Sequence, residues 1–157
     1  MGIVQELQEQ GICPTCYNFE HGGVYSDFTK RLIFEDEWLY CFLEERPRAK
    51  GHTIILVKAH YDDMAALPDE LCAHVFTIAK RLMNVLKTEL KAERVYLCSM
   101  CDGKANHFHA QLLPRYAGEK IGSTNFVKER WTYAENPVPV ERLEQLIKAM
   151  KEGTNNE

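Results

Sequence analysis

The fold is decided by one stretch of the sequence, His107-Phe108-His109-Ala110-Gln111-Leu112-Leu113-Pro114-Arg115. Polar and apolar residues alternate at its start, as they do in a β-strand, where every second side chain shares a face. We therefore expect a strand over 108–113, with His107, His109 and Gln111 projecting to one side of a sheet. Neutral imidazole can attack phosphorus, bind a metal or move a proton near neutral pH. The same spacing also fits a strand whose polar face is merely solvated.

Outward from this stretch, the remaining segments give a sheet with two helices. β-Branched or alternating residues predict strands at 31–34, 38–43, 53–57, 94–100 and 108–113. Apolar residues at helical spacing predict a long helix over 68–90 and a final helix over 140–150. Three strands, a helix, two strands and a helix are typical of an α+β domain. We expect an antiparallel sheet of about five strands, covered by the long helix.

Length and charge limit what this domain can do. A chain of 157 residues fits one domain, 1–157, and can bury a core without disulfide bonds. The net charge of −4 provides no basic surface for binding nucleic acid in bulk. Residues 1–11 carry acidic and amide side chains without a long apolar run, which is unlike a signal peptide or membrane anchor. A cytoplasmic location and no membrane partner are expected.

The chain has six cysteines, which we expect to be mostly reduced thiols. Two pairs have CxxC spacing, Cys13/Cys16 and Cys98/Cys101. The second pair lies at the end of the predicted strand 94–100. Positions i and i+3 of a strand face opposite sides, so these two thiols could not share a ligand sphere without a break in the strand. The first pair lies in an N-terminal segment, 1–30, that we expect to be irregular and able to form a metal knuckle. A redox pair or two unrelated thiols would explain this spacing as well.

Several motifs, taken in order, resemble the histidine triad superfamily over about residues 30–116. They are Arg46-Pro47-Arg48-Ala49-Lys50-Gly51-His52-Thr53, Val57-Lys58-Ala59-His60, Ser99-Met100-Cys101-Asp102-Gly103 and the His-x-His motif before Pro114-Arg115. The resemblance implies an antiparallel sheet with a long helix, a homodimer and a site that binds a small nucleotide. It also implies that His109, the middle residue of the triad, attacks the α-phosphorus and forms a covalent nucleotidyl-histidine.

Gln111 departs from the hydrolase branches of this family, which have a third His at that position. Gln is the pattern of transferases and phosphorylases such as galactose-1-phosphate uridylyltransferase and the diadenosine tetraphosphate phosphorylases. Its amide can donate an N–H to phosphate but cannot protonate a leaving group. The loop 104–106 is also shorter than in the fragile histidine triad protein and lacks its Gly-Gln/Ser phosphate contact.

These features leave three functions open. The first is transfer of a nucleoside monophosphate from a dinucleoside polyphosphate or nucleotide sugar. The second is hydrolysis of a nucleotidyl ester or phosphoramidate despite Gln111. The third is a nucleotide-binding regulatory protein with little catalysis. A zinc-dependent nucleic-acid binder is disfavoured by the acidic charge.

The zinc-bearing members of the superfamily, including the uridylyltransferase, imply a ligand set for this chain. They combine an N-terminal CxxC with a His before the long helix and with the first His of the motif. The matching residues here are Cys13, Cys16, His60 and His107. Two thiolates and two imidazoles satisfy tetrahedral Zn²⁺ without an open position, so the ion would be structural. In the alternative, His107 orients the active site by hydrogen bonding.

The resemblance also suggests roles around the nucleotide. His52 corresponds to a His that lies behind the family's active site and would support it from there. Glu44 falls where the family binds the ribose hydroxyls, although it could equally be an exposed residue at a strand end. The base pocket could be lined by Phe34, Leu43 and Ile54, although apolar strand residues are usually core.

Asn106 is either a second phosphate donor or a turn residue. Arg115 is a candidate for a phosphate or dimer contact, and His21 and His74 are expected on the surface. Residues 117–157 are expected to form a loop and the last helix. The part of the loop at 122–130 either closes over the phosphates or is a plain connector.

Overall fold

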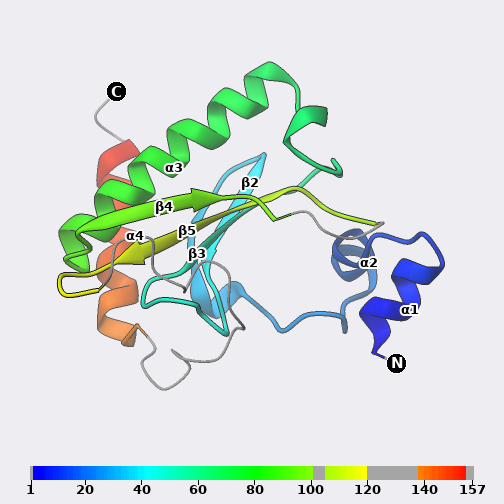
Figure 1. The fold of residues 1–157 in the computed structure, drawn as a ribbon, viewed down its shortest axis with the longest axis horizontal. Coiled ribbons are helices and arrows are strands. Elements are labelled where there is room, and N and C mark those ends of the chain that lie inside the picture. Colours follow the sequence, from blue (N-terminus) through cyan, green and yellow to red (C-terminus); the bar gives the residue numbers. More distant parts are fainter. Residues whose placement is uncertain (1, 101–104, 120–137, 155–157) are drawn as a thin grey trace.

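The computed structural model describes residues 2–100, 105–119 and 138–154. Its centre is a five-stranded antiparallel sheet in the order β1-β2-β3-β5-β4 (Figure 1). The strands are β1 (Leu32–Glu35), β2 (Leu39–Leu43), β3 (Thr53–Val57), β4 (Arg94–Cys98) and β5 (His109–Arg115). The predicted α+β class and sheet are therefore confirmed, with strand ends within about two residues of those expected from the sequence.

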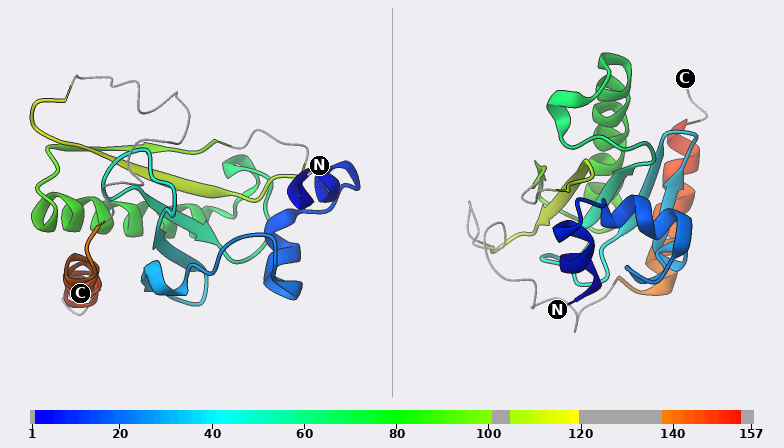
Figure 2. Two further views of the ribbon diagram at one scale, coloured as in Figure 1. Left: turned by 90° about the horizontal axis from the view of Figure 1, so that it is seen from below. Right: turned by 90° about the vertical axis from the view of Figure 1, so that its right-hand side faces the viewer.

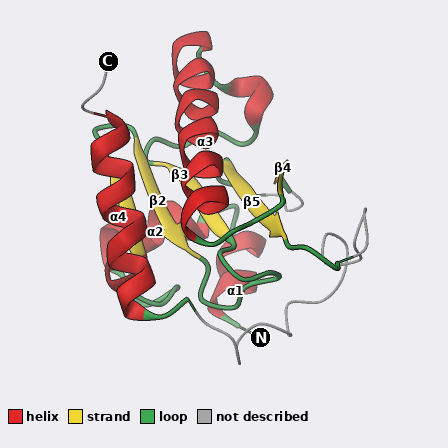
Figure 3. Cartoon of the chain, turned by 90° about the vertical axis from the view of Figure 1, so that its left-hand side faces the viewer, coloured by secondary structure: helices red, strands yellow, loops and turns green. Residues whose placement is uncertain are grey.

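Two helices cover one face of the sheet, α3 (Asp69–Glu89) and α4 (Val140–Thr154) (Figure 3). Helix α3 begins after Pro68 with acidic residues in its first turn, where the helix dipole favours them. Its buried residues include Val75, Ile78 and Leu82, which recur at helical spacing and face the sheet. Helix α4 adds buried Leu146 to the same core.

The sheet register places alternate rows of side chains on opposite faces. One row is Cys41, Ile55 and Ala110, all buried beneath the helices. On the other face, Phe42 lies opposite Ile54, and Ile54 lies opposite Gln111. The next row on that face is Tyr40, Leu56 and His109. This second face, away from α3 and α4, is where the candidate site is built.

The N-terminal segment was expected to be irregular, and this expectation was wrong. It contains helix α1 (Ile3–Glu9) and helix α2 (Pro14–His21). Cys13 is the N-cap residue of α2, because its Sγ accepts from the backbone N–H of Cys16 over 3.5 Å, and Pro14 fits the first helical turn. Both helices lie at the end of the molecule opposite α4 (Figures 1 and 2).

The alternation had suggested that His107 and His109 share a strand face, but His107 lies outside the strand. Strand β5 begins at His109, and the backbone before it follows a different path, in which the N–H of Phe108 donates to the carbonyl of Tyr61 over 2.7 Å. His107 does not line the pocket that His109 lines, and its Nδ1 lies beside the sulfurs of Cys13 and Cys16 instead.

Gly51, in the connection between β2 and β3, has a backbone φ of +80°. A side chain there would also crowd Leu90, because a Cβ atom would lie 2.6 Å from Leu90 Cδ1. Glycine tolerates both the positive φ and the close Leu90 side chain. The next residue, His52, then directly precedes β3.

In the described part of the chain, no helix combines the length and apolar character that crossing a membrane requires. The predictions for Cys101 and for the 122–130 loop fall outside the described residues.

Candidate functional site

His109 is held with one nitrogen facing a pocket. Its Nδ1 lies 2.9 Å from the carbonyl oxygen of His107. Because a carbonyl only accepts, Nδ1 carries the proton and donates, and in the neutral ring Nε2 keeps its lone pair. His109 lines the pocket, so this Nε2 is available as a nucleophile.

A chain of hydrogen bonds behind His109 orients Gln111. The backbone N–H of Arg48 donates to Nδ1 of His52 over 3.1 Å, so the proton of a neutral His52 lies on Nε2. That Nε2–H donates to Oε1 of buried Gln111 over 2.9 Å. The amide nitrogen of Gln111 then points toward His109 and lies 3.4 Å from its Nε2. Donors of Gln111 are thus directed at the position where a phosphate bound to His109 would sit.

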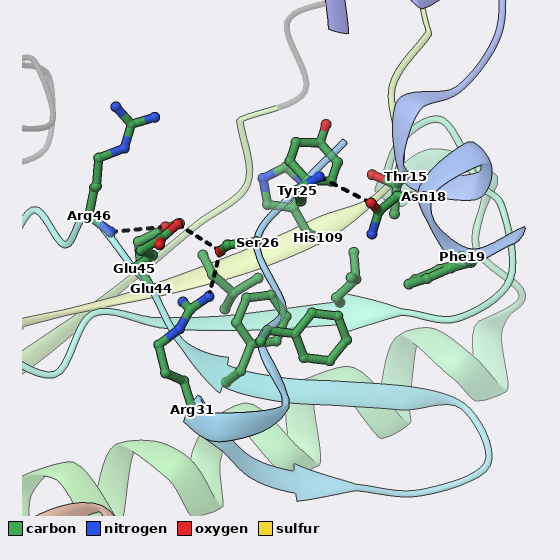
Figure 4. A pocket seen from close by; sticks show the side chains of 14 residues that line it. Thr15, Asn18, Phe19, Tyr25, Ser26, Arg31, Glu44, Glu45, Arg46 and His109 are labelled. Carbon is green, nitrogen blue, oxygen red and sulfur yellow. Dashed lines mark hydrogen bonds between the residues drawn. The ribbon is translucent and has the colours of Figure 1, made fainter. Parts of the chain in front are cut away.

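The pocket has a volume of about 290 Å³, near the lower end of the range for small-molecule sites, roughly 300–1,000 Å³. Its floor is apolar, and Phe28 and Phe42 stack there with ring centres 4.5 Å apart. Figure 4 shows a polar group at one end of the pocket and residues of α2 at the other, with His109 between them. The polar group is Ser26, Arg31, Glu44 and Glu45, and the α2 residues are Thr15, Asn18 and Phe19.

The predicted nucleotide-binding residues are only partly in this pocket. Glu44 and Ile54 line it. Phe34 and Leu43 do not line it: both lie on the opposite sheet face and pack in or against the core beneath the helices, which was the alternative for apolar strand residues. Asn106 is half-buried directly before His107, and its role stays a prediction.

Cys13, Cys16, His60 and His107 form what we call the Cys/His cluster, with all four ligand atoms within 4.8 Å of one another. The Sγ of Cys16 is 3.4 Å from Nδ1 of His60 and 3.5 Å from Nδ1 of His107, and the Sγ of Cys13 is 3.6 Å from the latter. In a tetrahedral zinc site with ordinary bond lengths, sulfur and nitrogen ligands are roughly 3.6 Å apart. The arrangement therefore has the dimensions of a zinc site.

The outer contacts of the two imidazoles also suit a metal. Nε2 of His107 donates to the carbonyl of Val57 over 2.6 Å, and Nε2 of His60 faces the carboxylate of Asp62 at 3.1 Å. Such contacts direct Nδ1 of each ring inward as a ligand. Burial lowers the pKa of His107, which favours the neutral form that binds metals. Burial and the neighbouring Cys13 raise the pKa of the Cys16 thiol to about 11, a penalty that a bound cation would reverse.

Three further residues can now be placed. Arg115 is buried, forms a salt bridge with Glu93 at 3.0 Å and does not line this pocket, so its predicted phosphate or dimer contact stays a prediction. His74 was expected on the surface, but it is partly buried and lies 2.6 Å from Asp36, which ties α3 to the β1–β2 turn. His21 is exposed, as expected.

The sequence analysis missed most of the pocket wall. The missed residues are Thr15, Asn18, Phe19, Tyr25, Ser26, Phe28, Arg31, Phe42, Glu45, Arg46 and Leu56. Strand parity could have identified Phe42, because Glu44 and Phe42 are two positions apart and share a face. No comparable signal marks the residues before 30, which reach the pocket through the placement of α2.

Comparison with known proteins agrees with this architecture. Residues 26–118 match the HIT domain. A HIT-like protein of Methanocaldococcus jannaschii is 28% identical over 100 residues, which cover 61% of this chain and 77% of that protein. The adenosine 5′-monophosphoramidase of Saccharomyces cerevisiae is 28% identical over 99 residues, 63% of this chain and 62% of the enzyme.

Among solved structures, a zinc-bound histidine triad family protein from Mycobacterium smegmatis superposes with a TM-score of 0.66 at 24% identity, over 92% of this chain and 97% of that one. A uridylyltransferase superposes with a TM-score of 0.65 at 17% identity, over 94% of this chain and 48% of that one. At such identities the likeness concerns the fold alone. Since the HIT domain match spans more than half of the sequence, the chain belongs to the HIT, or histidine triad, family.

Proposed function

We propose that this protein transfers or hydrolyses a nucleoside monophosphate group through a covalent intermediate on His109. The observation that carries the proposal is the orientation of the His109 ring, with Nδ1 donating to His107 and Nε2 on the pocket side. An imidazole fixed in this way has an unprotonated Nε2, whose lone pair meets only the long 3.4 Å contact from the Gln111 amide, and it needs no proton removed before it attacks.

The reaction would proceed in two displacements. Nε2 of His109 attacks the α-phosphorus, the bond from phosphorus to the leaving group breaks, and the leaving group takes the bonding electron pair. An acceptor oxygen, from water or phosphate, then attacks the same phosphorus and gives up its proton if it carries one. The phosphorus–nitrogen bond breaks, and its electron pair returns to His109.

Gln111 favours some leaving groups over others. Its amide can donate to a non-bridging phosphate oxygen as charge develops there, but it carries no acidic proton. A phosphorylated leaving group departs without being protonated, whereas an amine or alkoxide needs a proton. The site therefore suits dinucleoside polyphosphates and nucleotide sugars better than simple esters, and it suits transfer better than hydrolysis.

The pocket floor and its polar end suit a nucleoside. The stacked rings of Phe28 and Phe42, beside Ile54, offer an apolar surface for a base. The Glu44 carboxylate can accept hydrogen bonds from the ribose hydroxyls. The yeast relative is an adenosine 5′-monophosphoramidase, which makes adenine the first base to test.

We also propose that the Cys/His cluster holds one structural Zn²⁺. Two sulfurs and two imidazole nitrogens fill a tetrahedral shell, so the ion would have no open position for substrate. A homodimer is proposed from family membership, and β4 offers an open sheet edge for it with Leu97 exposed. Light scattering on the purified protein would test the dimer.

The function is tested by incubating the protein with diadenosine tetraphosphate, with and without phosphate, and separately with adenosine 5′-phosphoramidate. Phosphorolysis adds ADP to the products only when phosphate is present, whereas hydrolysis gives AMP in both cases. His109→Ala should abolish turnover and the acid-labile nucleotidyl adduct detected by mass spectrometry. His21→Ala, an exposed histidine on α2, is the matched control. Nucleotide binding without turnover by the unaltered protein would favour the regulatory alternative.

A further inference from the structure

Helix α2 belongs to both the Cys/His cluster and the pocket. Thr15, Asn18 and Phe19 line the pocket and follow the i, i+3, i+4 spacing of one helical face. Cys16, on the same helix, has its sulfur 3.4–3.5 Å from the Nδ1 atoms of His60 and His107. One short helix therefore carries one ligand atom of the cluster and several side chains of the pocket wall.

Apart from the cluster, few buried residues hold α2 in place. It has eight residues, fewer than the roughly 12–15 that an isolated helix needs for stability in water. Pro14 is its only buried residue, and within the described chain the main hydrophobic core has no member before Ile33. The position of α2 consequently depends strongly on the sulfur–imidazole contacts of the cluster.

Phe19 connects the two sites directly. Its ring meets the His107 ring edge-on at 5.9 Å between centres, and it lies 5.9 Å from the ring of Tyr40. The same Phe19 lines the pocket. Asn18 extends the connection, because its Oδ1 accepts from the backbone N–H groups of Val24 and Tyr25, each over 3.0 Å, and Tyr25 also lines the pocket.

We propose that metal binding at the Cys/His cluster and nucleotide binding in the pocket are positively coupled through α2, with Phe19 as the connecting side chain. Both ligands favour the same docked position of the helix, so each one stabilises the site of the other. The inference rests on the proposed function in one respect, that the pocket binds a nucleotide. Helix α2, which carries Phe19, precedes residue 26, where the HIT domain match begins, and so lies outside the matched part of the chain.

Thermodynamic linkage makes this coupling measurable from either side. If zinc tightens nucleotide binding by some factor, the nucleotide must tighten zinc binding by the same factor, commonly about 5–150-fold. Measuring how the nucleotide changes zinc binding begins with zinc-loaded protein, so the metal-free chain does not have to remain folded.

The experiment titrates zinc-loaded protein with a chromophoric zinc chelator, with and without saturating adenosine 5′-monophosphate. Calorimetry first establishes binding of the nucleotide to the loaded protein. We expect the nucleotide to tighten zinc retention at least about fivefold in the unaltered chain. In Phe19→Ala this factor should fall toward one while the protein still binds one zinc per chain. Phe76→Ala, an exposed phenylalanine on α3, is the matched control and should keep the full factor.

The outcomes separate this inference from the proposed function. If the zinc-loaded protein binds no nucleotide, both are overturned. If it binds the nucleotide and zinc retention is unchanged, the coupling alone is overturned. If the nucleotide tightens zinc retention as much in Phe19→Ala as in the unaltered protein, the role of Phe19 as the connecting side chain is overturned.

Discussion

Nε2 of His52 donates to Oε1 of Gln111 over 2.9 Å, and this contact determines which end of the Gln111 amide faces His109. The orientation originates in the backbone, because the Arg48 N–H fixes the proton position on His52. A chain of ordinary hydrogen bonds thus directs the amide nitrogen of Gln111 at Nε2 of His109, where the proposed reaction would place the phosphate. The first two predictions test this arrangement.

Gln111→Glu keeps the shape of the side chain but removes both amide donors and adds a negative charge beside the phosphate. We expect kcat to fall about 10²–10³-fold, the usual cost of losing a donor that stabilises developing charge. Steady-state kinetics with diadenosine tetraphosphate measures the change. A variant with unaltered kcat would show that Gln111 does not contact the phosphate.

His52→Ala leaves buried Oε1 of Gln111 without its donor and should lower the free energy of unfolding by about 1–3 kcal/mol. The rate should also fall, because the amide can then turn its oxygen toward the phosphate. A double-mutant cycle separates positioning from general damage. In a Gln111→Ala background, His52→Ala should cost little further activity; two independent losses would contradict the positioning role.

Removing the metal should destabilise the N-terminal helices more than the sheet. Cys16→Ser and His60→Ala should each reduce bound zinc, measured by elemental analysis, and lower the melting temperature of protein purified with zinc. Cys72→Ser replaces a half-buried cysteine of α3 that lies outside the cluster, and it should retain the metal. Full zinc retention in His60→Ala would remove that residue from the ligand set.

Gly51→Ala should lower the free energy of unfolding by about 1–3 kcal/mol, because the new methyl meets Leu90 at a backbone φ of +80°. Gly153→Ala is the contrasting change. It lies near the end of α4 with no atom within 4 Å of the added Cβ, so it should be neutral or stabilise by up to about 1 kcal/mol. Urea denaturation compares the two, and equal losses would refute the argument from conformation.

Phe42→Ala and Phe34→Ala separate the two faces of the sheet. Phe42 stacks on Phe28 in the pocket, so its loss should weaken nucleotide binding about tenfold, equivalent to roughly 1.4 kcal/mol. Phe34 packs against the core, so its loss should lower stability while the dissociation constant stays unchanged. Calorimetric titration and thermal unfolding together measure both effects. A weakened affinity in Phe34→Ala would contradict this assignment.

The sequence predicted the structure best where a short, local pattern of residues determines the helix or strand. The apolar spacing of α3 and the β-branched run of β3 predicted both elements within about one residue, because burial of one face imposes the period. The relative orientation of His107 and His109 was harder to predict. His107 turns toward the cluster because the strand begins only at His109, and no local signal marks that boundary.

The errors at the pocket have a different cause. Leu43 and Phe34 were considered for their chemistry, although Leu43 is out of phase with Glu44 and Phe34 pairs with the buried Cys41. Strict use of the two-residue period would have excluded Leu43. The contribution of α2 could not be predicted in this way, since it depends on contacts between residues up to 91 positions apart.

The position of β5, second from the sheet edge between β3 and β4, has a consequence for the order in which the two sites form during folding. The cluster needs His107, just before that strand, to meet cysteines more than 90 residues earlier, and the catalytic arrangement needs Gln111 to reach His52, 59 residues earlier. Any partly folded chain in which β5 has not been inserted lacks both sites at once. During refolding, completion of the four-residue cluster and formation of the His52–Gln111 contact should therefore appear in the same kinetic phase, the one in which β5 joins the sheet.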